Sequence, residues 1–285
     1  MIEQMNLFDN NKSSSMILKY VRESLNKSSD ELSKELGFDW IKAENNEIIL
    51  SEEQIRDLYV NVSLDKVDIC KALFGTTGGF FHGSKNGIKG NITLNKGRDK
   101  IDFGRGFYIG DNILQVATLC ASSSNPIIYK CSIDFNKLKM YRFTSSEHWS
   151  LYIAVNRNII NERMSSKLYN YYLNLCNGYD LVVGPIADDS LSTSFYKYCD
   201  ANSNLTLDDL VRVLTMVKLG NQYVFKTENS LKRINIEKSI KIVGNDKQLF
   251  IVLSRINYSY GKLAGRMLGR NKKGKTFKEI LKEWR

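Results

Sequence analysis

The segment that decides the fold spans residues 102–109 and reads DFGRGFYI. Two glycines flank Arg105, and two aromatic residues follow them directly. Glycine permits turns that other residues resist, whereas aromatic residues favour strands. The segment therefore predicts a glycine-rich turn that contains a basic residue, followed at once by a short strand that carries Tyr108.

Two further segments, one on each side of this turn, contain residues suited to ligand contact. FHGS at 81–84 ends an expected strand on His82, and Gly83 lets a ligand approach backbone groups that can pair with an amide. NQYVF at 221–225 opens a late strand with a polar pair. Each segment has an ordinary alternative: a hydrogen-bonded core histidine, a simple turn, or the polar start of a strand.

Short apolar runs separated by glycines fill the middle of the chain from Phe74 onward. The predicted strands outnumber the helices and do not alternate regularly with them, which indicates an α+β domain rather than a doubly wound sheet. Strands are expected at 79–82, 107–109, 127–133, 139–143, 181–183, 223–225, 240–243 and 250–253, and helices at 112–122, 146–160, 192–199, 207–218 and 276–284.

The first 70 residues read instead as short helices. Apolar residues recur at helical spacing from Ile17, and Ser28 with Glu31 and Ser51 with Gln54 have the spacing of capping boxes. We therefore expect a small all-helical domain at 16–70, after a flexible start at 1–15.

The stretch LKYVRESLNKSSDELSKELGF, residues 18–38, resembles the small helix-turn-helix domain of phage-repressor-like regulators. This resemblance implies DNA binding or autoregulation. A DNA reader needs positive charge on its recognition helix, however, and the residues after the turn are acidic. The charge favours a protein-contact or purely structural role over DNA binding.

The net charge of +10 is unevenly distributed. Residues 1–70 hold 14 acidic and 8 basic side chains, whereas residues 255–285 hold 10 basic and 2 acidic ones. Such a basic C-terminal tail can bind phosphates or an acidic partner, and it can equally be a solvated helix without a specific partner. The acidic start could contact a neutralising protein partner of the antitoxin kind.

Several classes of protein are excluded by composition. The sequence contains no apolar run of transmembrane length and no secretory signal, so we expect a cytoplasmic protein without a membrane partner. Five cysteines without a C-x-x-C pair argue against a disulfide framework and a zinc knuckle. No metal site is expected, because the chain has two histidines and the adjacent Asp188 and Asp189 fit a turn better than a ligand pair.

Taken together and in this order, the three segments resemble the signature of the ADP-ribosyltransferase superfamily of the poly-ADP-ribose-polymerase and diphtheria-toxin type. That signature reads His-Gly-(Thr/Ser), then Phe-Gly-Lys-Gly-Ile-Tyr-Phe, then Asn-Glu-Tyr-(Ile/Val). YDLVVGPIADD at 179–189 looks like an uncharacterised bacterial branch placed in that superfamily. The resemblance covers about residues 79–235 and implies an ADP-ribosyltransferase-like domain at 71–254, with a split mixed sheet and an NAD cleft between its halves.

The resemblance also implies roles for single residues. His82 would bind ribose hydroxyls, the Gly83 backbone would hold the nicotinamide carboxamide, and Tyr108 would stack on the nicotinamide ring. Arg105 would face the pyrophosphate. The full sets implied are His82, Tyr108 and Gln222 for catalysis, and His82, Gly83, Ser84, Arg105, Gly106 and Tyr108 for contact with NAD, which is a substrate.

One departure from the signature affects the expected activity. The catalytic glutamate of the family corresponds to Gln222, which can bind a hydroxyl but cannot offset positive charge. This argues against polymer synthesis and leaves mono-ADP-ribosylation of a protein or nucleic-acid acceptor, by a toxin-like or phage-defence effector. Transfer to RNA or to a 2′-phosphate stays open, and so does a catalytically weakened module that binds NAD or ADP-ribose. Candidate replacement carboxylates are Asp99, Asp102, Glu147 and Asp189.

Overall fold

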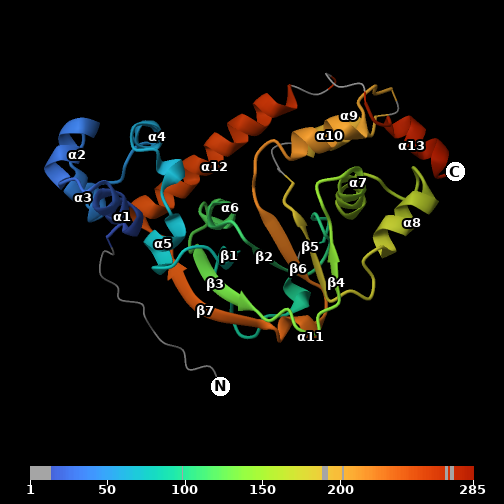
Figure 1. Cartoon of the computed structure of the whole chain (residues 1–285), viewed down its shortest axis with the longest axis horizontal. Coiled ribbons are helices and arrows are strands. Elements are labelled where there is room, and N and C mark those ends of the chain that lie inside the picture. Colours follow the sequence, from blue (N-terminus) through green and yellow to red (C-terminus); the bar gives the residue numbers. More distant parts are fainter. Residues whose placement is uncertain (1–13, 98, 188–191, 201, 267–268, 270–272) are drawn as a thin grey trace.

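The computed structural model describes residues 14–97, 99–187, 192–200, 202–266, 269 and 273–285. At its centre is one mixed seven-stranded sheet with the order β4-β5-β6-β2-β1-β3-β7 (Figure 1). β4 and β5 are parallel, and the other neighbouring strands are antiparallel. The strands are β1 (Phe80–Ser84), β2 (Phe107–Gly110), β3 (Ile127–Ile133), β4 (Met140–Arg142), β5 (Leu181–Pro185), β6 (Asn221–Phe225) and β7 (Ile234–Lys241).

The sheet is weakly joined in its middle. β1 pairs with β2 at one position, Phe81 opposite Gly110, whereas it pairs with β3 along its whole length. β2 pairs along its whole length with β6. The sheet therefore consists of two well-paired halves, β4-β5-β6-β2 and β1-β3-β7, which separate beyond Phe81.

Most of the helices lie in two groups at opposite ends of the molecule (Figure 1). α1–α5 and α12 lie together at one end of the molecule, α7–α10 and α13 lie at the other, and α6 sits beside β1. The α+β class predicted from the sequence is confirmed. The helices are α1 (Met16–Leu25), α2 (Ser29–Leu36), α3 (Trp40–Glu44), α4 (Glu52–Asn61), α5 (Ile69–Phe74), α6 (Ile113–Cys120), α7 (Glu147–Asn156), α8 (Ser166–Asn174), α9 (Ser192–Tyr198), α10 (Leu207–Leu214), α11 (Glu228–Leu231), α12 (Gly244–Gly265) and α13 (Phe277–Glu283).

Local capping signals in the sequence are matched by the structure. Ser28 with Glu31 and Ser51 with Gln54 form complete capping boxes at the starts of α2 and α4. Each box satisfies two backbone N–H groups that a helix start leaves without an intrahelical partner. Short-range spacing was sufficient to predict these helix starts.

The prediction of a strand at 250–253 is wrong, because these residues lie inside α12. Leu249, Phe250, Val252 and Leu253 are all buried in one core, and a short apolar run cannot distinguish a buried helix from a strand. Six of the eight β7 residues lie before the predicted segment 240–243, and most of them are exposed. α12 is long, yet no helix in the described part of the chain has the length and apolar character needed to cross a membrane.

The N-terminal helices share one core with the sheet domain. Trp40 and its neighbours belong to the same buried cluster as Phe81 of β1 and Phe250 of α12. The domain boundary expected after residue 70 therefore falls within α5 and inside this continuous core, and the boundary expected at 254/255 lies within α12. Of the start expected to be flexible, residues 1–13 lie outside the described residues, and Ser15 is a buried N-cap.

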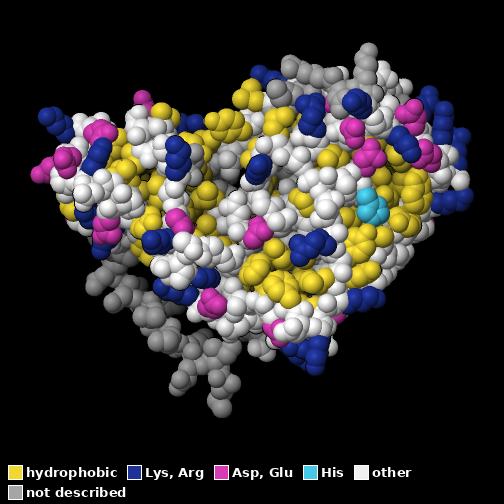
Figure 2. Space-filling view, viewed as in Figure 1, with side chains coloured by type: hydrophobic (Ala, Val, Ile, Leu, Met, Phe, Trp, Pro, Cys, Tyr) yellow, Lys and Arg dark blue, Asp and Glu magenta, His cyan; other side chains and the backbone are white. Residues whose placement is uncertain are grey.

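α3 follows the turn of the helix-turn-helix-like stretch, and one of its faces is turned inward. Trp40 and Ala43 are fully buried. Glu44 accepts hydrogen bonds from Arg22 at 2.8 and 2.9 Å and from the Trp40 indole at 3.1 Å. Over this end of the molecule acidic and basic side chains are interspersed (Figure 2). Part of the acidic charge counted in the sequence thus belongs to internal pairs.

Two residues at the start of α12 bind the N-terminal helices to the sheet domain. Asp246 accepts hydrogen bonds from the Ser15 hydroxyl and from the backbone N–H groups of Met16 and Ile17, at the start of α1. Asn245 donates to the carbonyls of Ala43 and Ile48, at 2.7 and 2.9 Å. A carboxylate at a helix N-terminus is favourable, and here it comes from a distant part of the chain.

Burial raises the pKa of Asp246 to about 6, against 3.8 for an ordinary aspartate, despite the three donated hydrogen bonds. Between these two values the folded protein binds a proton that the unfolded chain does not. This group therefore stabilises the fold increasingly as pH falls from 6 to 4, by about 3 kcal/mol over the full interval.

We expect Asp246→Asn to remove this contribution. The stability of the variant relative to wild type should fall as pH decreases from 7 to 4, measured by urea unfolding at each pH. Asp57→Asn, at an exposed position of α4, is the control and should follow wild type. A constant difference between wild type and Asp246→Asn across this range would contradict the assignment.

Candidate active site

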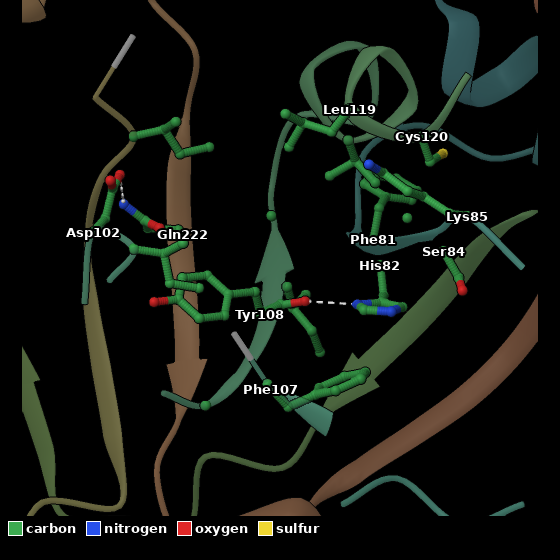
Figure 3. A pocket seen from close by; sticks show the side chains of 18 of the residues that line it. Phe81, His82, Ser84, Lys85, Asp102, Phe107, Tyr108, Leu119, Cys120 and Gln222 are labelled. Atoms are coloured by element: carbon green, nitrogen blue, oxygen red, sulfur yellow. Dashed lines mark hydrogen bonds between the residues drawn. The ribbon is translucent and has the colours of Figure 1, made fainter. Parts of the chain in front are cut away.

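A cavity of about 1140 Å³ opens where β1 and β2 separate. One wall is formed by β1 and the loop after it, the floor by β2, and another wall by α6 (Figure 3). The remaining side comes from Asp102, Arg157, residues near 186 and Gln222 of β6. Three segments that are distant in the sequence thus meet around one cavity.

His82 crosses the gap between the two strands. Its Nδ1 lies 2.8 Å from the carbonyl oxygen of Tyr108, and its ring stacks on Phe107 with centroids 4.3 Å apart. A carbonyl can only accept, so Nδ1 carries the hydrogen and Nε2 of the neutral ring is an acceptor. Burial lowers the pKa of His82, which favours this neutral form near pH 7. Nε2 is thus suited to accept a hydrogen bond from a ligand hydroxyl.

Tyr108 is fixed by its hydroxyl group. The hydroxyl donates to the Gly104 carbonyl at 2.6 Å and accepts from the Phe103 N–H at 3.2 Å. Its ring lies beside Gln222 and lines the cavity (Figure 3). The glycine-rich turn and the strand after it therefore hold one aromatic face in place.

Gln222 is buried and has one defined orientation. Its Nε2 donates to Asp102 Oδ2 at 2.8 Å and to the Pro185 carbonyl at 3.2 Å (Figure 3). Asp102 is itself paired through Oδ1 with Arg157, whose Nε lies 2.7 Å away. Among the described residues no donor contacts Gln222 Oε1. Because Gln222 lines the cavity, this oxygen is available to a ligand there.

The two glycines predicted to contact NAD line the cavity and are also required by packing. A Cβ on Gly83 would lie 2.7 Å from the Val116 carbonyl of α6, and one on Gly106 would lie 2.6 Å from Val224 of β6. Both distances are too short for any other residue. Ser84 lines the cavity at the end of β1, half-buried.

Arg105 does not lie with the other predicted site residues. Its side chain is exposed and pairs with Asp99 at 2.8 Å, and it is not among the described residues that line the cavity. The basic side chains that do line it are Lys85, Lys89, Lys100 and Arg157.

The four candidate carboxylates have different positions. Asp99 is engaged with Arg105 outside the cavity, and Glu147 faces Asp208 and Lys275 on the α7 side. Asp189 lies outside the described residues. Asp102 is the one acidic side chain among the described residues that line the cavity.

Lys226 was not singled out by the sequence. Its Nζ donates to the carbonyls of Phe103 and Arg105, at 2.6 and 2.7 Å, so it braces the glycine-rich turn from the end of β6. Burial lowers its pKa to about 8. The one signal for it in the sequence is a single lysine directly after the buried residues of β6. A lysine in that position is equally compatible with an ordinary strand end.

Comparison with known proteins adds one finding. No curated protein and no solved structure matches the chain. The sequence model of one family, described as protein of unknown function (DUF3990), matches residues 79–236. This match covers more than half of the chain, from the residue before β1 into β7, and includes every residue named above as lining the cavity. The chain therefore belongs to the DUF3990 family.

Proposed function

We propose that this protein is an NAD-dependent mono-ADP-ribosyltransferase that releases nicotinamide and transfers ADP-ribose to a macromolecular acceptor. One observation carries the proposal. The three segments that resemble the ADP-ribosyltransferase signature meet around one cavity, with His82, Tyr108 and Gln222 all lining it. Such convergence of residues from distant segments is typical of a functional site.

The residues of the cavity suit NAD as a substrate. Its volume, about 1140 Å³, is slightly above the range of roughly 300–1,000 Å³ that small-molecule sites usually occupy, so it has room for a ligand as large as a dinucleotide. The Tyr108 ring provides a stacking surface for nicotinamide, and His82 Nε2 an acceptor for a ribose hydroxyl. Lys85, Lys89 and Lys100 supply positive charge for a pyrophosphate.

The proposed reaction is substitution at the ribose C1′ carbon. The bond from C1′ to the nicotinamide nitrogen breaks, and its electron pair stays on that nitrogen, which loses its positive charge. A lone pair of the acceptor forms the new bond to C1′, and the acceptor proton passes to solvent. The site must stabilise an oxocarbenium-like state and hold the ribose while this happens. Gln222 Oε1 can hold a ribose hydroxyl, and its lack of charge favours single transfer over polymer synthesis.

We propose a protein or a nucleic acid as the acceptor. The basic residues of 255–285 favour an acidic acceptor or a nucleic acid, including an RNA phosphate. A toxin-like or phage-defence effector restrained by an antitoxin-like protein fits this activity, with the N-terminal helices as the surface for that partner.

A second candidate is a module that binds NAD or ADP-ribose without turnover. The neutral amide of Gln222, held by two acceptors, favours it. The two candidates differ in one observable, which is the release of nicotinamide.

We expect the purified protein, with bacterial lysate as acceptor source, to release nicotinamide from NAD. The double substitution His82→Ala, Tyr108→Ala should lower this release about 100-fold, because it removes the ribose acceptor and the stacking surface. Tyr258→Ala, at an exposed site on α12, is the matched control and should leave the rate unchanged. NAD labelled in the adenylate half would then identify the acceptor.

NAD binding by calorimetry without release would support the binding module instead. Absence of both binding and release in a folded wild-type protein would contradict both candidates.

The state of His82 predicts how binding depends on pH. Because burial lowers its pKa below the ordinary 6.5, the affinity for NAD should stay level as pH falls through 6.5. It should weaken at lower pH, where Nε2 takes up a proton and can no longer accept. Calorimetric titrations from pH 8 to pH 5 test this, with His82→Asn expected to show a weaker and flatter profile. A loss that begins above pH 6.5 would argue against a neutral His82.

A further inference from the structure

We propose that Asp102 supplies the negative charge of this site and acts on the reacting ribose through the amide of Gln222. The proposal rests on the transferase function proposed above and assigns a positioning residue to it. The negative charge that a glutamate at position 222 would carry lies instead on Asp102, one hydrogen bond away from that position.

The first step of the argument is the orientation of the amide. Gln222 Nε2 has two hydrogens, and its partners are Asp102 Oδ2 at 2.8 Å and the Pro185 carbonyl at 3.2 Å. Both partners are acceptors, so a flipped amide would place Oε1 against two oxygens without any donor. The carboxylate therefore selects the orientation in which Oε1 faces the cavity.

The second step is electrostatic. A hydrogen bond from the amide to a carboxylate is charge-assisted, and in a buried site it polarises the amide toward a more negative oxygen. Gln222 is buried, and the Asp102 side chain is 9% exposed. Oε1 is thus a stronger acceptor for a ribose hydroxyl than a solvated glutamine oxygen would be, and it presents negative potential toward a developing oxocarbenium ion.

The third step concerns how Asp102 is held. Arg157 pairs with Oδ1, the oxygen that does not contact Gln222, and its guanidinium lies over the Phe195 ring at 5.7 Å. This ion pair occupies Oδ1 and leaves Oδ2 for the glutamine. A merely structural ion pair would not need the second oxygen to face a residue of the cavity.

The arrangement explains why β6 carries glutamine. A glutamate at position 222 would place a second carboxylate within hydrogen-bond distance of Asp102, and two such groups cannot both ionise readily. An asparagine at position 102 would remove this conflict. Its Nδ2 can donate to the carboxylate that Gln222→Glu introduces, while its Oδ1 accepts from Arg157. Pro185 would keep the hydrogen bond from the Trp149 indole, at 3.2 Å.

The expected compensation between positions 102 and 222 is tested with variants of the full chain. Asp102→Asn, Gln222→Glu and the double variant are compared with wild type for nicotinamide release and for NAD affinity. We expect Asp102→Asn to lower kcat at least about 10-fold while the Kd for NAD changes less than about 3-fold. Gln222→Glu should also be impaired, with release that varies with pH where wild type is level. The double variant should recover at least wild-type kcat. Asp99→Asn, on an exposed aspartate of the same loop, is the matched control.

The outcomes separate this proposal from the function on which it rests. A wild-type protein that neither binds NAD nor releases nicotinamide would overturn both. Wild-type turnover with unchanged kcat in Asp102→Asn, or a double variant no better than the two single ones, would overturn the role of Asp102 alone. If wild type binds NAD without turnover, the double variant must gain release, and its failure to do so counts against Asp102.

Thermal melting identifies variants that have lost the fold. If Asp102→Asn is one of them, Asp102→Glu replaces it, with an intermediate kcat expected.

Discussion

The hydrogen bond from His82 to the Tyr108 carbonyl is the interaction on which the site depends. β1 and β2 are neighbours in the sheet, yet their backbone pairing is limited to Phe81 and Gly110. Beyond that point the His82 side chain takes the place of backbone hydrogen bonds between the two strands. Its ring nitrogen lies 2.8 Å from the carbonyl oxygen of Tyr108, so the ring spans the space between the separated backbones. The same contact fixes which ring nitrogen carries the hydrogen, and so it determines what His82 offers to a ligand. The opening of the sheet and the chemistry of the cavity have one common cause.

Both sides of this opening are supported by packing that leaves little freedom. On one side α6 lies directly on Gly83, and α6 in turn shares its core with α12 and the N-terminal helices. On the other side Gly106 lies against β6, and Lys226 braces the turn before it. Close packing of this kind transmits strain instead of absorbing it. The N-terminal helices are therefore mechanically connected to one wall of the cavity, through buried contacts and through Asp246.

The charged side chains that line the cavity are mostly basic. Several basic side chains line it, whereas Asp102 is the single acidic one within the described part of the chain, and it is held between Arg157 and Gln222. A site of this composition attracts an anionic ligand while keeping one negative group at a defined place. This is the electrostatic balance that a reaction on a pyrophosphate-containing substrate with a cationic reacting centre would require.

The sequence by itself determined the elements whose signals are local. It predicted the α+β class, the capping boxes of α2 and α4, and the segments that carry His82, Tyr108 and Gln222, because capping and strand patterns depend on neighbours within a few residues. Only the tertiary structure decided which distant side chains meet. It placed Arg105 outside the cavity, brought Asp102 and Arg157 to Gln222, joined Asp246 to α1, and made a helix of the apolar run at 250–253. These outcomes depend on the packing of whole elements against each other, which short-range periodicity does not encode.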